Sequence, residues 1–161
     1  MHRVAQFVSH VRARVAPEEM AFARRILAEP SARLFDAMPV ADRRHALDVV
    51  ERLLARGHDD RDLLTAALLH DVAKGHRMRL WHRVLGVLLA AFAPGLLRRL
   101  AHPDPASGRH PFHLFLHHAP LSAQLAERDG VSARAVAFIR GTADPADAHL
   151  TRALTESDDA S

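Results

Sequence analysis

The chain has 161 residues, of which 48% are hydrophobic and 25% charged, with a formal net charge of +3 and no cysteine. This composition is typical of one folded globular domain spanning residues 1–161, and it excludes intrinsic disorder, disulfides and metals held by thiolates. The charge excess is small, tyrosine is absent, and no basic block is interleaved with aromatic residues, which excludes nucleic acid as the main partner.

Helical periodicity runs through the whole chain. No segment alternates apolar and polar residues as a strand does, and β-branched and aromatic residues are sparse. Prolines stand where helices would begin, including Pro120, and glycines stand where they would end. We therefore predict an all-α, compact multi-helix bundle. The predicted helices span residues 3–14, 18–28, 39–56, 61–73, 79–92, 95–101, 120–129, 132–140 and 146–157.

Two segments bear on location. The N-terminal stretch carries basic residues and no long apolar block, so we expect no secretory signal and a cytoplasmic protein. The most apolar stretch, VLGVLLAAFAPGLL at 84–97, has 14 residues, whereas a membrane-spanning helix needs about 20. We interpret it as a buried core helix and expect no membrane partner; a membrane-surface segment is the alternative.

Three ionisable residues continue the apolar stripes of two neighbouring predicted helices. His45 precedes Val49 by four residues, which places it on the inward face of the first helix. His70 and Asp71 directly follow the apolar run 63–69 of the second helix and lie on its buried side. All three side chains are therefore expected to point toward the interior.

The two histidines are also level along their helices. A short polar turn that begins at Gly57 joins the helices, and short connections make antiparallel neighbours. His45 lies 12 residues before this glycine and His70 lies 13 after it. At ~1.5 Å per residue both stand roughly 18–20 Å from the turn. A lone histidine on an apolar face is usually a core residue, but two at one level can share an ion.

Asp71 strengthens the metal interpretation, because a partly buried carboxylate needs a strong partner and a divalent cation supplies one. Two imidazoles and a carboxylate form a site of borderline softness. The sequence predicts one divalent ion (Mn, Fe, Co, Ni, Zn or Mg) as cofactor. Its affinity is expected to fall as pH drops through roughly 6.5, because protonated imidazole cannot bind a metal.

The combination of His45, His70-Asp71 in ALLHDVAK, and Lys74 resembles the HD superfamily of metal-dependent phosphohydrolases, whose signature is H…HD…D on a helical bundle. The resemblance is dense at 43–75 and looser beyond, with the core motif at 40–160. It implies a single HD-type helical domain, a divalent metal, and hydrolysis of a phosphate ester. The implied partner is a small phosphorylated substrate, with a nucleotide favoured.

The resemblance also implies a final aspartate ligand on a later helix. Asp158 follows Leu154 by four residues on the apolar face, whereas Asp159 follows polar residues. Asp158 is therefore the predicted ligand. Asp144 and Asp147 are weaker alternatives.

Some members of this superfamily bind a second metal through further histidines. His118, in HHAPLSAQLAERDG, aligns with an apolar face, but the later segment IRGTADP, which includes Thr142, contains no histidine, so one metal is expected. The remaining clustered histidines are expected in loops and on the surface: His102, His110, His113 and His117.

The leading functional prediction is an enzyme. The ion would polarise a phosphoryl oxygen and lower the pKa of bound water, Asp71 would orient or deprotonate that water, and Lys74 or His118 would stabilise charge on the phosphoryl group. The alternative is a catalytically degenerate HD domain that serves as a nucleotide-binding or regulatory module.

Removing Asp71 is expected to change the metal-free fold little or to stabilise it, since an unpaired carboxylate is costly.

Overall fold

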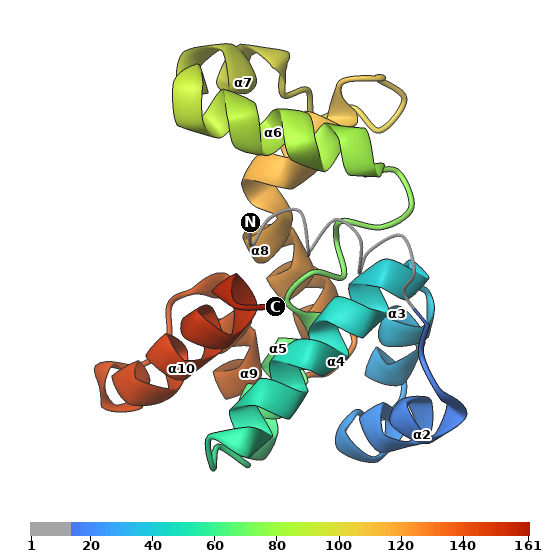
Figure 1. Ribbon diagram of the computed structural model, residues 1–161, viewed down its shortest axis with the longest axis vertical. Coiled ribbons are helices and arrows are strands. Elements are labelled where there is room, and N and C mark those ends of the chain that lie inside the picture. The colour runs from blue at the N-terminus through green and yellow to red at the C-terminus, as the bar shows by residue number, and fades with distance from the viewer. Residues whose placement is uncertain (1–13) are drawn as a thin grey trace.

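The computed structural model describes residues 14–161, which form a helical bundle (Figure 1). No strand occurs in these residues, so the all-α prediction is confirmed. The predicted helix at 3–14 falls almost wholly outside the described part of the chain. The helices are α2 (Pro17–Ile26), α3 (Ser31–Asp36), α4 (Val40–Ala55), α5 (Arg61–Leu69), α6 (Leu80–Phe92), α7 (Pro94–Leu100), α8 (His110–Arg128), α9 (Ala133–Arg140), the 3-10 turn η1 (Pro145–Asp147) and α10 (Ala148–Asp159).

The core forms around α5. All seven residues from 63 to 69 are buried, because the run LLTAALL is apolar except for one threonine. Helices α2, α3, α4, α9 and α10 all contact it. Asp60 caps its N-terminus by accepting a hydrogen bond from the Leu63 amide at 3.0 Å. This helix therefore holds its C-terminal end, where His70 lies, in the middle of the bundle.

Helices α4 and α5 form the antiparallel pair that the short turn predicts. Gly57 has a φ of 81°, a left-handed conformation that glycine adopts without steric cost, and it lets the chain reverse after α4. Helix α5 ends at Leu69, earlier than predicted, and His70 caps it. Asp71 consequently lies in the turn that follows the helix rather than within it.

Helix α8 differs from the prediction. It runs from His110 to Arg128 with Pro120 inside it, so Pro120 does not begin a helix. Proline removes one backbone hydrogen bond, but the helix is packed on both sides of it: Phe112 and Leu114 are buried before Pro120, and Ala123 and Ala126 are buried after it. The packing of these buried residues outweighs the loss of one backbone hydrogen bond at Pro120.

Helix α6 is not the buried core helix that its composition suggests. Only His82 and Gly86 are buried in it, while much of its apolar surface faces outward. Helices α6 and α7 form a hairpin that lies on α8 at one end of the molecule, apart from the core around α5 (Figure 1). They have too few neighbours to cover all their apolar residues. Within residues 14–161, no helix combines the length and apolarity needed to cross a bilayer.

The sequence pattern does not predict helix α3. It is six residues long and has no side-chain cap, so it lacks the periodic pattern that identifies longer helices. Its buried residues Ser31, Ala32 and Phe35 contribute to the packing, and the helix contacts α5. Tertiary packing accounts for its position.

Candidate metal centre

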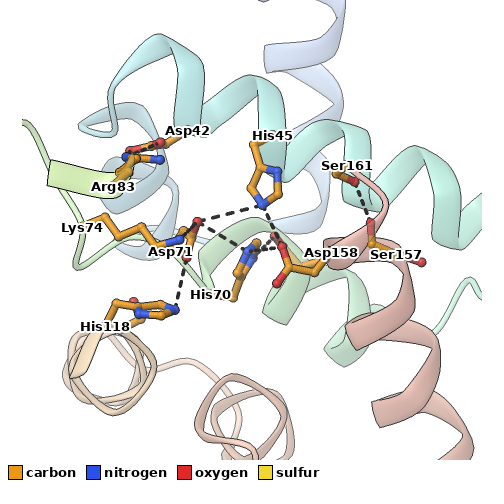
Figure 2. Close-up of polar contacts among 12 residues, drawn as sticks. Asp42, His45, His70, Asp71, Lys74, Arg83, His118, Ser157, Asp158 and Ser161 are labelled. Atoms are coloured by element: carbon orange, nitrogen blue, oxygen red, sulfur yellow. Dashed lines mark hydrogen bonds and ion pairs between the residues drawn. The ribbon is translucent and has the colours of Figure 1, made fainter. Parts of the chain in front are cut away.

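Three helices bring two histidines and one aspartate to a common point (Figure 2). His45 comes from α4, His70 from the C-terminal cap of α5, and Asp158 from the last turn of α10. The Oδ1 atom of Asp158 lies 2.8 Å from Nε2 of His45 and 3.4 Å from Nε2 of His70. One ligand atom from each residue lies within 4.8 Å of the others, so the group could hold a metal ion. The helical spacing predicts that His45 and His70 meet, whereas the participation of Asp158 was implied by the resemblance of the sequence motif.

His70 has the orientation of a metal ligand. Its Nδ1 lies 2.9 Å from the carbonyl oxygen of Ala67, which can only accept, so Nδ1 carries a proton and donates. This hydrogen bond fixes the ring with Nε2 directed into the group, as in many histidine–metal sites. Nε2 is buried and has no hydrogen-bond partner. This nitrogen can either carry a proton directed at Asp158, whose Oδ1 lies 3.4 Å away, or offer its lone pair to a cation.

Asp71 lies beside this group, fully buried with 1% of its surface exposed. Its Oδ2 atom is 3.9 Å from Nε2 of His45 and 3.7 Å from Nε2 of His70. The same oxygen accepts a hydrogen bond from Nζ of Lys74 at 2.5 Å. The carboxylate is therefore not unpaired, so the premise behind the expected small or stabilising effect of its removal on the metal-free fold does not hold.

The turn after α5 positions both Asp71 and Lys74. The carbonyl of Asp71 accepts from the Lys74 amide at 2.9 Å, which closes the turn. The amide of Ala73 donates to Oγ of the fully buried Ser122 on α8 at 3.1 Å. Sequence analysis missed Ser122, because a small residue in an apolar stripe gives the same pattern as a packing residue.

His118 on α8 faces the other oxygen of Asp71. Its Nδ1 donates to the carbonyl oxygen of Phe115 at 3.0 Å, and its Nε2 lies 3.8 Å from Oδ1 of Asp71. Burial and the charge of Lys74 lower the pKa of His118, so the imidazole is neutral at pH 7 and Nε2 is an acceptor. Oδ1 of Asp71 is also buried without a hydrogen-bond partner. Two acceptors face each other there, which is suited to a donor such as water between them.

The charges at this centre are strongly coupled. Burial by itself would lower the pKa of His70, but the carboxylates of Asp71 and Asp158 outweigh burial and raise it to about 9. Burial would raise the pKa of both carboxyls, but Lys74 and His70 hold the pKa of Asp71 well below its usual range, and His45 and His70 do the same for Asp158. In the metal-free protein, protonated His70 therefore neutralises part of the acidic charge.

The weaker ligand candidates have other partners. Asp144 accepts from the Ala146 amide at 2.8 Å and caps η1, and Asp147 binds Arg134 through two hydrogen bonds of 2.8 Å. Neither belongs to the converging group.

The other histidines also lie outside the converging group. His102 is in the loop before α8, while His110, His113 and His117 follow one another along the first half of α8. The His113 ring lies 5.7 Å from His110 and 4.6 Å from His117, centroid to centroid.

The donor set of two imidazole nitrogens and a carboxylate oxygen fits a divalent ion of borderline softness. The unpartnered Nε2 of His70 supports the same assignment. Comparison with known protein-family models, curated proteins and solved structures finds no match for this chain.

Proposed function

We propose that the chain is an HD-type, metal-dependent phosphohydrolase acting on a small phosphorylated molecule, with nucleotides as the favoured substrate class. One observation carries the proposal. His45, His70 and Asp158 converge beside the buried Asp71, and their order along the chain is that of the H…HD…D pattern. Residues 113 positions apart in sequence meet at 2.8 Å at this point.

Four residues would hold the ion: His45 and His70 through Nε2, Asp158 through Oδ1, and Asp71 through its carboxylate. When bound, such an ion supplies Lewis acidity toward a phosphoryl oxygen and makes a neighbouring water more acidic. His70 would release the proton that it carries in the metal-free protein in order to hold the ion.

Asp71 and His118 are placed to handle the attacking water. A water between Oδ1 of Asp71 and Nε2 of His118 would donate one hydrogen to each, which fixes its orientation. His118 is neutral and accepts the proton as the water oxygen bonds to phosphorus and the leaving oxygen departs. The resulting imidazolium and Lys74 then stabilise the negative charge of the phosphoryl group.

A binding or regulatory module is the second candidate, and the ion pair between Lys74 and Asp71 favours it. A lysine ammonium at 2.5 Å already neutralises the carboxylate that catalysis would use. The segment around Thr142 also supplies no histidine for a second ion. In this case nucleotide binds and is not cleaved.

Turnover measurements distinguish the two candidates. The protein is stripped with chelator, loaded with Mn²⁺ or Co²⁺, and assayed against mononucleotides, cyclic dinucleotides, ppGpp and a generic phosphoester. The phosphohydrolase proposal expects metal-dependent phosphate release that is lost in His45→Ala and Asp71→Asn. His149→Gln, an exposed histidine on α10, is the matched control and should retain the activity. Nucleotide binding without turnover would favour the module, and undiminished turnover by Asp71→Asn would refute the mechanism.

A further inference from the structure

The α6–α7 hairpin exposes several large apolar side chains. Among the described residues, six of the eight exposed large hydrophobic side chains belong to this hairpin. Phe92 is 83% exposed and Trp81 is 54% exposed. We define the hairpin face by Trp81, Val84, Val87, Leu88, Phe92 and Leu96.

The packing of α6 determines which side remains open. Gly86 lies so close to α8 that a Cβ added there would come within 2.7 Å of the Phe115 ring. This close contact seats one side of α6 on α8 and turns the opposite side outward. An open, shallow groove lined by Arg79, Leu80, Trp81, Val84, Leu85 and Leu88 lies along that outer side.

The charged residues of the hairpin and of the segment that precedes it are all basic. The segment 72–103 contains six lysine and arginine residues and no aspartate or glutamate. Lys74 and Arg83 are paired with acidic residues of other segments, but Arg79, Arg98 and Arg99 are exposed. The face is therefore apolar with a cationic border, the pattern of helices that lie in a membrane interface.

We propose that the hairpin face docks on the surface of an anionic phospholipid bilayer. Phe92 and Leu88 enter the boundary between headgroups and acyl chains, Trp81 lies at headgroup level, and Arg98 and Arg99 meet lipid phosphates. The hairpin lies on the membrane and does not cross it. This inference is independent of the proposed hydrolase activity, since it involves none of the metal-site residues.

Charge favours a bilayer over a second copy of the chain as the occupant. Pairing two hairpin faces would bring the exposed arginines of one copy near those of the other, which is unfavourable without intervening anions. An anionic bilayer instead supplies opposite charge at the border and an apolar medium at the centre. An anionic bilayer therefore complements both the apolar side chains and the arginines of the hairpin face.

Vesicle flotation tests the proposal with the full chain. Vesicles of 30% phosphatidylglycerol and 70% phosphatidylcholine should carry the protein, pure phosphatidylcholine should carry much less, and added salt should weaken binding. Trp81 is the single tryptophan, so its emission should shift to shorter wavelength on binding. Phe92→Ser should reduce partitioning about tenfold, from the apolar transfer it removes. Arg98→Glu with Arg99→Glu should reduce it by roughly fivefold or more per site, on anionic vesicles only.

Leu54→Ser is the matched control, because Leu54 is an exposed leucine on α4 outside the hairpin face, and it should bind like the parent. Both Phe92 and Leu54 are exposed, so circular dichroism should show that each variant is folded. Absence of flotation, or equal flotation of Phe92→Ser, would overturn the proposal. Equal binding to neutral vesicles would overturn the role of the arginines. A dimer in sedimentation that Phe92→Ser dissociates, without vesicle binding, would assign the face to a second copy.

Discussion

Proton competition at His70 provides the sharpest test of the metal centre. The pKa of this imidazole is raised to about 9 in the metal-free protein, because the carboxylates of Asp71 and Asp158 outweigh the effect of burial. At pH 7 the ring is therefore almost fully protonated. Its Nε2 must lose this proton before it can bind an ion, which costs about 3 kcal/mol at pH 7 for a pKa two units higher.

This cost fixes both the slope and the range of the pH dependence. Metal affinity should rise about tenfold per pH unit from pH 7 to about 9 and then level off, since above the pKa no proton remains to be displaced. The sequence alone placed this transition near 6.5, the ordinary value for an exposed histidine. The difference arises from two carboxylates that the fold brings next to His70.

Titration calorimetry with Mn²⁺ measures this directly. Runs at pH 7.0, 8.0 and 9.0, in pairs of buffers with different ionisation enthalpies, give both the affinity and the number of protons released. At pH 7.5 about one proton should leave His70 per ion bound. His149→Gln should behave as the parent does. Equal affinities at pH 7 and 9, or release of less than about half a proton, would refute the assignment of His70 as a ligand that carries a proton in the free protein.

Three further predictions concern stability. Asp71→Asn should destabilise the chelated protein by about 3 kcal/mol in urea unfolding, since Lys74 loses its buried partner; a mutant as stable as the parent would contradict that ion pair. In chelator, thermal stability should fall as pH rises, because the pKa of His70 is higher in the folded than in the unfolded state: its stabilisation is complete below about 6.5 and lost through about 9. Saturating Mn²⁺ should remove this decline. Gly86→Ala should cost roughly 1–3 kcal/mol, because its Cβ would meet the Phe115 ring at 2.7–2.9 Å, while metal affinity stays unchanged; an unaltered urea midpoint would show that the ring moves aside freely.

The meeting of the two histidines at the candidate metal centre could be predicted because helix geometry converts sequence spacing into position. A short turn makes α4 and α5 antiparallel, and equal distances from Gly57 bring His45 and His70 level. That a later aspartate joins them was implied only by the resemblance to the HD superfamily, and the spacing to Leu154 on the buried side of α10 then selected Asp158 over Asp159. The pairing of the two histidines requires only periodicity and one loop length, both of which can be read from the local sequence.

The surroundings of Asp71 could not be predicted in the same way. Lys74 was identified as a possible phosphate contact, but its ion pair with Asp71 depends on the turn that replaces the last predicted turn of α5. Ser122 stabilises that turn from α8, 49 residues away. Such a contact depends on how distant helices pack, and no local pattern reports it.

The prediction that α6 is a buried core helix was wrong for a related reason. Composition identifies an apolar helix but does not count the neighbours available to cover it. The hairpin contacts mainly α8, so Phe92 remains 83% exposed, and Trp81 remains 54% exposed although its ring meets Phe112 of α8. The sequence predicts that α6 is an apolar helix, but whether its apolar side chains are buried depends on how much surface the rest of the chain offers to cover them.

The order in which the metal donors come together also has a consequence for folding kinetics. His45 and His70 belong to adjacent helices, so their meeting closes a short loop, whereas Asp158 is 113 residues from His45 and its arrival closes a long one. Contacts between distant segments form late, because the entropy of closure must be met first. The α4–α5 hairpin therefore presents two imidazoles before α10 docks. An ion captured by this hairpin gives the last helix a charged target, and refolding in Mn²⁺ should proceed faster than refolding in chelator.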